Sequence, residues 1–313
     1  MALAFTFPGQ GSQSVGMGSA LIEAYPAARE VFEAVDDALG EKLSKVMAEG
    51  PKEELTLTEN AQPAIMAVSV AAMRALKVEF GVDVTAAKFV AGHSLGEYSA
   101  LCAAGALSLE DAAKLLKLRG QAMQRAVPVG QGAMAALLGA EMEQADAAVD
   151  AGKSEGVVTI ANDNAPGQIV ISGAKAAVEA ALAAAKEAGV RKAMLLDVSA
   201  PFHCPLMLPA ADAMREALSD VTINAPAAPV VTNVSAQAVS DPETIRAQLV
   251  EQVTGKVRWR ESVDYMHQAG VDRFAEAGAK VLTPMIKRHI KEAEGIALVE
   301  PDHLKAFAET IKG

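Results

Sequence analysis

Hydrophobic residues follow two patterns that alternate along this chain. Short apolar runs predict buried strands, and longer stretches with apolar residues three and four positions apart predict amphipathic helices. Before residue 127, the predicted strands are Ala2–Phe7 and Lys88–Ala91, and the predicted helices are Ser19–Met47, Thr58–Val78 and Leu109–Ala126. Strands alternating with helices predict an α/β fold on a mainly parallel sheet.

The pattern changes between residues 128 and 198, where the element order becomes βαββαβ. The predicted elements are strand Ala133–Leu138, helix Met142–Ala151, strands Val157–Ala161 and Gln168–Ser172 around a turn at Asn162–Gly167, helix Lys175–Ala188 and strand Lys192–Val198. This order is typical of a ferredoxin-like unit. We therefore predict a small subdomain at 128–198, inserted into a core formed by 1–127 and 199–313. Pro229–Asn233 and Arg273–Glu276 are candidate strands that return to the main sheet.

Composition excludes some classes of protein. Of the 313 residues, 51% are hydrophobic, which is enough for a large core. The net charge of −11 and the absence of a long basic stretch argue against nucleic-acid binding. The basic segment Lys287–Lys291 is interpreted as a solvated helix face, with a docking patch for an acidic partner as the alternative.

The cysteines and the hydropathy of the chain indicate the cellular compartment in which the protein works. Cys102 and Cys204 form no CxxC motif and no metal-ligand spacing. The first residues lack a basic segment and reach Pro8 too soon for a signal peptide. No window approaches the ~20 apolar residues of a membrane span. We expect a cytoplasmic, monomeric protein with neither a membrane nor a nucleic acid as partner.

The sequence Gly-His-Ser-Leu-Gly at 92–96 fits G-x-S-x-G, the nucleophile elbow. At such an elbow, a strand turns sharply into a helix and the serine adopts a strained backbone. Glycines two positions away on either side allow the strand and helix to approach each other. An apolar strand precedes Ser94 and a helix-forming segment follows it. A glycine-rich turn without chemistry is the alternative interpretation.

A nucleophilic serine needs a base. Among the five histidines, His203 follows a predicted strand in a proline-flanked loop, where catalytic groups are commonly held. His93 lies inside the elbow and is expected to point away from Ser94. Asp163 and Asp197 are possible third members of a triad, but a Ser–His dyad oriented by a neutral carbonyl fits equally well.

Four separated motifs together resemble the malonyl-CoA:acyl-carrier-protein transacylases, over essentially the whole chain. They are FPGQGSQ at Phe7–Gln13, GHSLGEYSA at Gly92–Ala100, KLRGQAM around Arg119, and SAPFHCPLM at Ser199–Met207. The segment Val250–Trp259 also fits this family. The resemblance implies an α/β-hydrolase-like core with an inserted ferredoxin-like subdomain.

The resemblance also implies roles for individual residues. Ser94 would carry the acyl group, with His203 as its general base and Gln252 orienting His203 through its side-chain carbonyl. The N–H groups of Gln10 and Leu95 would form the oxyanion hole. For Leu95 the elbow predicts the same independently, because the N–H after the nucleophile serves this purpose. The PGQG segment read alone is also consistent with a simple tight turn.

Two further residues would select the substrate. Arg119 would hold the free carboxylate of a malonyl group with two parallel hydrogen bonds, although a solvated helix face explains its position equally well. Phe202 would cap the acyl pocket and disfavour an α-methyl branch. Cys204, beside His203, has no activating partner as a nucleophile.

The implied reaction is ping-pong transfer from malonyl-CoA to the phosphopantetheine thiol of acyl carrier protein, without a metal or other cofactor, in type II fatty-acid synthesis. The alternatives are a serine thioesterase or esterase, and a non-catalytic scaffold that binds carrier protein or coenzyme A.

Overall fold

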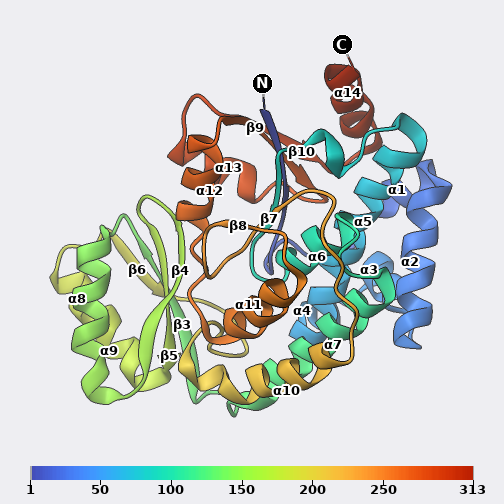
Figure 1. Cartoon of the computed structure of the whole chain (residues 1–313). Helices are drawn as coiled ribbons and strands as arrows, with labels where there is room; N and C mark the ends of the chain where they lie inside the picture. Colours follow the sequence, from blue (N-terminus) through green and yellow to red (C-terminus); the bar gives the residue numbers. More distant parts are fainter. Residues whose placement is uncertain (1, 313) are drawn as a thin grey trace.

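The computed structural model describes residues 2–312 and contains two sheets (Figure 1). The larger sheet has the strand order β10-β9-β1-β2-β7-β8. All neighbours in it are parallel except β7 and β8. Its strands are β1 (Ala2–Phe7), β2 (Phe89–Gly92), β7 (Val230–Val231), β8 (Ala238–Val239), β9 (Val271–Ala277) and β10 (Glu294–Leu298).

Helices cover both faces of this sheet because its strands are apolar on both sides. In β1, Leu3, Phe5 and Phe7 belong to one buried cluster, whereas Ala4 belongs to a second cluster with residues of α12 and α13. The helices of this part are α1 (Ser19–Ala24), α2 (Pro26–Leu39), α3 (Leu43–Glu49), α4 (Lys52–Thr56), α5 (Thr58–Phe80), α6 (Gly96–Ala103), α7 (Leu109–Ala126), α10 (Leu208–Ser219), α11 (Pro242–Thr254), α12 (Trp259–Gln268), α13 (Leu282–His289) and α14 (Pro301–Lys312), with short 3₁₀ helices at Val84–Ala86 and Pro205–Met207.

The smaller sheet is antiparallel, with the order β4-β5-β3-β6 and its own hydrophobic core beneath two helices. Its elements are β3 (Gly132–Leu138), α8 (Met142–Gly152), a 3₁₀ helix at Lys153–Glu155, β4 (Val158–Ala165), β5 (Gln168–Ala174), α9 (Lys175–Glu187) and β6 (Lys192–Leu195). This topology is ferredoxin-like, so the predicted fold class is confirmed. The boundaries 128 and 198 remain a prediction.

Several predicted elements differ in length. The helix predicted at 19–47 is three helices, interrupted before Pro26 and at Gly40, where φ is +66°. The turn predicted at Asn162–Gly167 is wrong in extent, because β4 continues to Ala165. Its polar residues are stabilised there by a parallel bridge from Asn162 to Val257, which lies outside the small subdomain.

An ion pair also joins the two subdomains at β4. The Asp163 carboxylate is 1% exposed and accepts two hydrogen bonds of 3.0 Å from Nε of Arg260 and one of 2.8 Å from its Nη2. The backbone N–H of Asp163 donates to the Val257 carbonyl. This contact fixes one edge of the small sheet beside α12.

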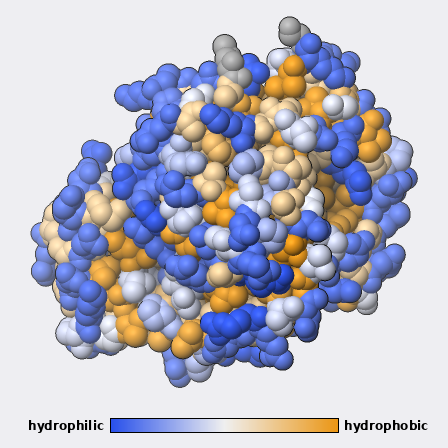
Figure 2. Space-filling model, viewed as in Figure 1, coloured by the Kyte–Doolittle hydropathy of each residue, from blue (hydrophilic) through white to orange (hydrophobic). Residues whose placement is uncertain are grey.

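Polar side chains cover most of the molecular face in Figure 2, with apolar side chains between them. Of the helices within residues 2–312, none is both long enough and apolar enough to cross a membrane.

Candidate active site

Ser94 stands between the end of β2 and the start of α6, with a left-handed φ of +54°. The two neighbouring glycines make this turn possible. A Cβ on Gly92 would lie 1.9 Å from the carbonyl carbon of Gly96, and a Cβ on Gly96 would lie 2.3 Å from the Phe7 carbonyl oxygen. A side chain at Gly92 would therefore push β2 away from the start of α6, and one at Gly96 would push α6 away from the end of β1.

His203 faces Ser94 from the loop after the small subdomain. The Ser94 hydroxyl donates to Nε2 of His203 at 2.8 Å. On the opposite side, Nδ1 lies 2.9 Å from the Gln252 backbone carbonyl and 3.2 Å from that of Gly255, which assigns the ring proton to Nδ1. Burial, and secondarily the positive charge of Arg119, lower the pKa of His203 to about 3. The imidazole is therefore neutral, and its Nε2 accepts the hydrogen bond from Ser94.

The expected role of the Gln252 side chain is wrong. Its backbone carbonyl, and not its side-chain carbonyl, contacts His203. The side-chain Oε1 instead accepts a hydrogen bond of 2.9 Å from Nη2 of Arg119, and Nε2 donates to the Ser94 carbonyl at 3.0 Å. Gln252 therefore connects the histidine, the arginine and the elbow.

Neither aspartate considered as a third member contacts His203. Asp163 is paired with Arg260, and Asp197 is an exposed residue at the pocket wall. Within residues 2–312, the hydrogen-bond partners of the His203 ring are the Ser94 hydroxyl and two main-chain carbonyls. The geometry is that of a dyad oriented by neutral carbonyls.

Arg119 is 1% exposed, so the alternative of a solvated helix face is wrong. Its Nη1 donates to Oε1 of Gln62 at 2.7 Å, and its Nη2 lies 3.2 Å from the Ser94 hydroxyl oxygen. The guanidinium also lies 5.8 Å from the centre of the Tyr98 ring. Neutral partners therefore hold a buried cation beside the serine.

Gln10 and Leu95, whose N–H groups are predicted to form an oxyanion hole, follow the adjacent strands β1 and β2. Leu95 directly precedes α6, and Gln10 lies in the turn after β1. No acceptor within residues 2–312 takes up either N–H. Thr58, at the start of α5, donates to the side-chain oxygen of Gln10 at 2.9 Å and so holds this turn.

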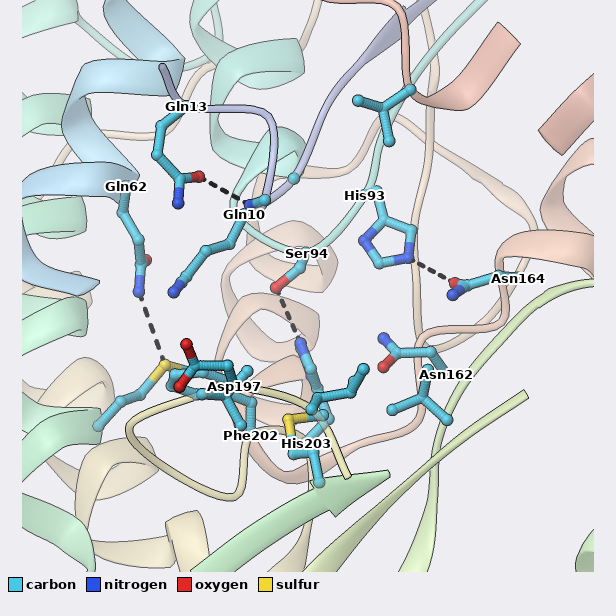
Figure 3. A pocket seen from close by; sticks show the side chains of 18 of the residues that line it. Gln10, Gln13, Gln62, His93, Ser94, Asn162, Asn164, Asp197, Phe202 and His203 are labelled. Carbon is cyan, nitrogen blue, oxygen red and sulfur yellow. Dashed lines mark hydrogen bonds between the residues drawn. The ribbon is translucent and has the colours of Figure 1, made fainter. Parts of the chain in front are cut away.

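A cavity of about 370 Å³ connects these groups, and both subdomains line it. Phe202 lies in its wall, as expected. Figure 3 shows Ser94 directed at His203, whereas His93 points to Asn164, whose side-chain oxygen is 2.8 Å from His93 Nε2. The lining residues are Gly9, Gln10, Gly11, Gln13, Thr56, Gln62, His93, Ser94, Arg119, Met123, Met134, Asn162, Asn164, Val170, Leu196, Asp197, Val198, Phe202, His203, Val281, Leu282 and Met285.

Sequence reasoning missed Gln62, Glu97 and Asn164. A glutamine or asparagine in a helix or strand carries no motif of its own, so only the fold reveals these contacts. Glu97 offered a signal, because it is an acidic residue inside an otherwise apolar segment after the elbow. Its side chain is completely buried, and burial raises its pKa to about 7.

Cys204 is not poised as a nucleophile. Its thiol is buried and donates to the Pro201 carbonyl at 3.1 Å, and burial raises its pKa. Raising the pKa disfavours the reactive thiolate. Within residues 2–312, no group of three or more His, Cys, Asp or Glu side chains is arranged to hold a metal ion.

The elbow thus holds Ser94 in hydrogen-bond contact with His203 and beside the buried Arg119. The model of the acyl transferase domain family matches residues 4–307. The chain belongs to this family and is an acyltransferase.

Close relatives carry a more particular name. The chain is 45% identical to the malonyl CoA-acyl carrier protein transacylase of Bacillus subtilis (strain 168), over 99% of this chain and 97% of that protein. It is 51% identical to the crystal structure of the acyl-carrier-protein-S-malonyltransferase of Bartonella henselae, with a TM-score of 0.98 and complete coverage of both chains. A malonyl-transacylase solved in complex with its type II PKS acyl-carrier protein is 40% identical, with a TM-score of 0.95 over 99% of this chain and 100% of that chain.

Proposed function

We propose that this chain transfers a malonyl group from malonyl-CoA to the phosphopantetheine thiol of acyl carrier protein, through a malonyl-serine intermediate. One observation carries the proposal: a buried arginine lies 3.2 Å from the hydroxyl of a serine that is hydrogen-bonded to a neutral histidine. The names of the relatives support the same reaction.

In the first half-reaction, Ser94 gives its proton to Nε2 of His203 as its oxygen attacks the thioester carbonyl carbon. The Gln10 and Leu95 N–H groups stabilise the resulting oxyanion, a contribution of about 3–4 kcal/mol for one donor. The carbon–sulfur bond then breaks, and the coenzyme A sulfur takes the proton from His203. The main-chain carbonyls of Gln252 and Gly255 stabilise the imidazolium while it carries this proton.

Arg119 supplies the selectivity for a dicarboxylic acyl group. The carboxylate of malonate provides two oxygens to the guanidinium, and this pairing is charge-assisted. Within residues 2–312, the hydrogen-bond partners of this buried cation are all neutral, so an arriving carboxylate neutralises it. Phe202 closes the acyl pocket, and a methyl branch there costs ~1–3 kcal/mol.

The second half-reaction reverses the first with a different thiol. His203 takes the proton of the carrier's phosphopantetheine thiol, and the sulfur attacks the ester carbonyl. The Ser94 oxygen leaves and recovers its proton from His203. No electron transfer and no metal is required by this sequence of steps.

Intact-protein mass spectrometry tests the proposal. The chain is mixed with malonyl-CoA and then with holo acyl carrier protein, with Ser94→Ala as the control. We expect an adduct on Ser94 that moves to the carrier, and no adduct in the control.

The other outcomes separate the alternatives. An adduct that decays equally fast with and without carrier identifies a hydrolase. A folded chain that binds carrier but forms no adduct identifies a scaffold.

We also propose that the enzyme acts in the cytoplasm as a monomer in type II fatty-acid synthesis. The two free cysteines, Cys102 and Cys204, agree with a reducing compartment. Size-exclusion chromatography with light scattering tests the oligomeric state.

A further inference from the structure

Asn233 binds the first half of the nucleophile elbow through its side-chain amide. Its Oδ1 accepts the Ser94 backbone N–H at 2.7 Å, and its Nδ2 donates to the Gly92 carbonyl at 2.6 Å. The side chain is completely buried, so water does not replace either bond.

These two bonds continue the main sheet beyond the end of its backbone pairing. β7 runs parallel to β2, with Val230 opposite Val90 and Val231 opposite Ala91, and then stops. Two residues later, the Asn233 amide offers one acceptor and one donor to the turn that follows β2. It therefore pairs with the elbow as the backbone of a longer strand would.

The elbow needs such a restraint because Ser94 is strained. A left-handed backbone at a non-glycine residue costs on the order of 1–3 kcal/mol and persists only where the surroundings determine it. Ser94 has a φ of +54°, and its N–H and the carbonyl two residues earlier are both held by Asn233.

Asn233 is held in turn by α6. Its backbone N–H donates to Oε2 of Glu97 at 2.8 Å, and Glu97 lies in the first turn of the helix that begins at the elbow. The Asn233 carbonyl accepts the N–H of Arg258 at 3.0 Å. The Glu97 backbone N–H also donates to the Ser94 carbonyl at 3.0 Å, so Ser94, Asn233 and Glu97 form a closed loop of contacts.

We infer that Asn233 is a positioning residue that keeps the Ser94 hydroxyl in line with His203, and that Glu97 holds Asn233 in place. This inference rests on the proposed role of Ser94 as the nucleophile. It assigns a function to a residue that touches neither the acyl group nor the thiol.

The test measures Ser94 reactivity with two reagents. One is malonyl-CoA, followed in single turnovers by mass spectrometry. The other is a small fluorophosphonate, which needs the activated serine but neither Arg119 nor the malonyl pocket. The variants are Asn233→Ala and Asn233→Asp, and the matched control is Ser69→Ala, which removes a different buried hydrogen bond, to the Ala277 carbonyl.

We expect Asn233→Ala to slow both reactions ~100-fold, the loss that a displacement of about 1 Å causes. The concentration of malonyl-CoA at half-maximal acylation should stay within about 2-fold. Ser69→Ala should lower the melting temperature similarly and leave both rates unchanged. Asn233→Asp keeps the acceptor for Ser94 and replaces the donor to Gly92, so it should slow both reactions ~10-fold, the effect of about 1.4 kcal/mol.

Unchanged rates in folded Asn233→Ala overturn the inference. If Asn233→Ala does not fold, the rates of Asn233→Asp with the two reagents provide the test, and unchanged rates again overturn the inference. A wild-type enzyme that reacts with fluorophosphonate but not with malonyl-CoA refutes the proposed function while the fluorophosphonate rates still test Asn233. A wild-type enzyme that reacts with neither refutes both.

Discussion

His203 is oriented by the main chain of Gln252, since Nδ1–H donates to the Gln252 carbonyl at 2.9 Å while the Gln252 side chain bonds to Arg119. One residue thus contacts His203 through its backbone and Arg119 through its side-chain amide. The two contacts are separable by substitution, because every amino acid supplies the same carbonyl.

Gln252→Ala should therefore leave the orientation of His203 unchanged and remove one hydrogen bond of Arg119. We expect the Nδ1–H proton of His203 to remain visible by NMR, and malonyl acylation to slow about 10-fold through loss of one charge-assisted hydrogen bond. Disappearance of the Nδ1–H signal in a folded variant would show that the side chain orients the base after all.

Arg119→Ala should reverse the acyl preference. Malonyl acylation should lose about 2–5 kcal/mol of transition-state stabilisation, whereas acetyl-CoA should still acylate Ser94. Arg125→Ala, at the exposed end of the same helix, is the control and should leave both reactions unchanged. Rates with each thioester check this, and equal losses for malonyl and acetyl groups would contradict it.

Gly96→Ala should destabilise the fold severely. The new methyl carbon would lie 2.3 Å from the Phe7 carbonyl oxygen, so the free energy of unfolding should fall by more than about 3 kcal/mol. At Gly40, φ is +66° and a new methyl carbon would have no atom of residues 2–312 within 4 Å apart from the chain neighbours, so alanine should cost only about 1 kcal/mol. Urea titrations of both variants provide the comparison, and similar losses would mean that the elbow relaxes around the methyl group.

Substituting either member of the Asp163–Arg260 pair should destabilise the fold, but by different amounts. Arg260→Met leaves a buried carboxylate unpaired and should cost about 3 kcal/mol. Asp163→Asn leaves an arginine that is 33% exposed and turns to solvent, so its cost should be about 1 kcal/mol. The double variant should cost less than the two single changes together. If denaturation shows that the double variant loses as much stability as the two single variants together, the two residues are not coupled.

Glu97 should make the stability of the protein depend on pH. Burial raises its pKa from 4.5 to about 7, so between these values the folded chain holds a proton that the unfolded chain releases. The free energy of unfolding should then decrease as the pH rises through this window, by on the order of 3 kcal/mol. Glu97→Gln should lack this decrease. Parallel pH slopes for the two proteins would exclude a raised pKa.

The parts of the site that depend on local spacing were predictable from the sequence. The glycines around Ser94 must be two positions away for a strand to turn into a helix, and this requirement is visible without a structure. The βαββαβ order likewise predicted the small sheet. The segment Glu294–Leu298 was missed because a charged residue and a glycine at its start hide an edge strand.

Other contacts depend on tertiary packing, which spacing does not contain. Arg119 and Lys117 lie two positions apart on α7, yet only the arginine points into the site. Main-chain contacts such as that of Gln252 leave no side-chain signature at all. Asn162 and Asp163 have the composition of a turn, yet they form a strand, because they pair with Val170 and Ile169 of β5 and also with Val257 and Arg260 outside the small subdomain.

The cavity lies between two subdomains, each of which packs around its own hydrophobic core. Mutations that reshape the wall formed by the inserted sheet, at Met134 or Val170 for example, change the space offered to an acyl chain without disturbing the packing behind Ser94. Evolution and protein engineering can thus vary one wall of the cavity, in the inserted sheet, while the elbow and the residues packed around Ser94 stay the same.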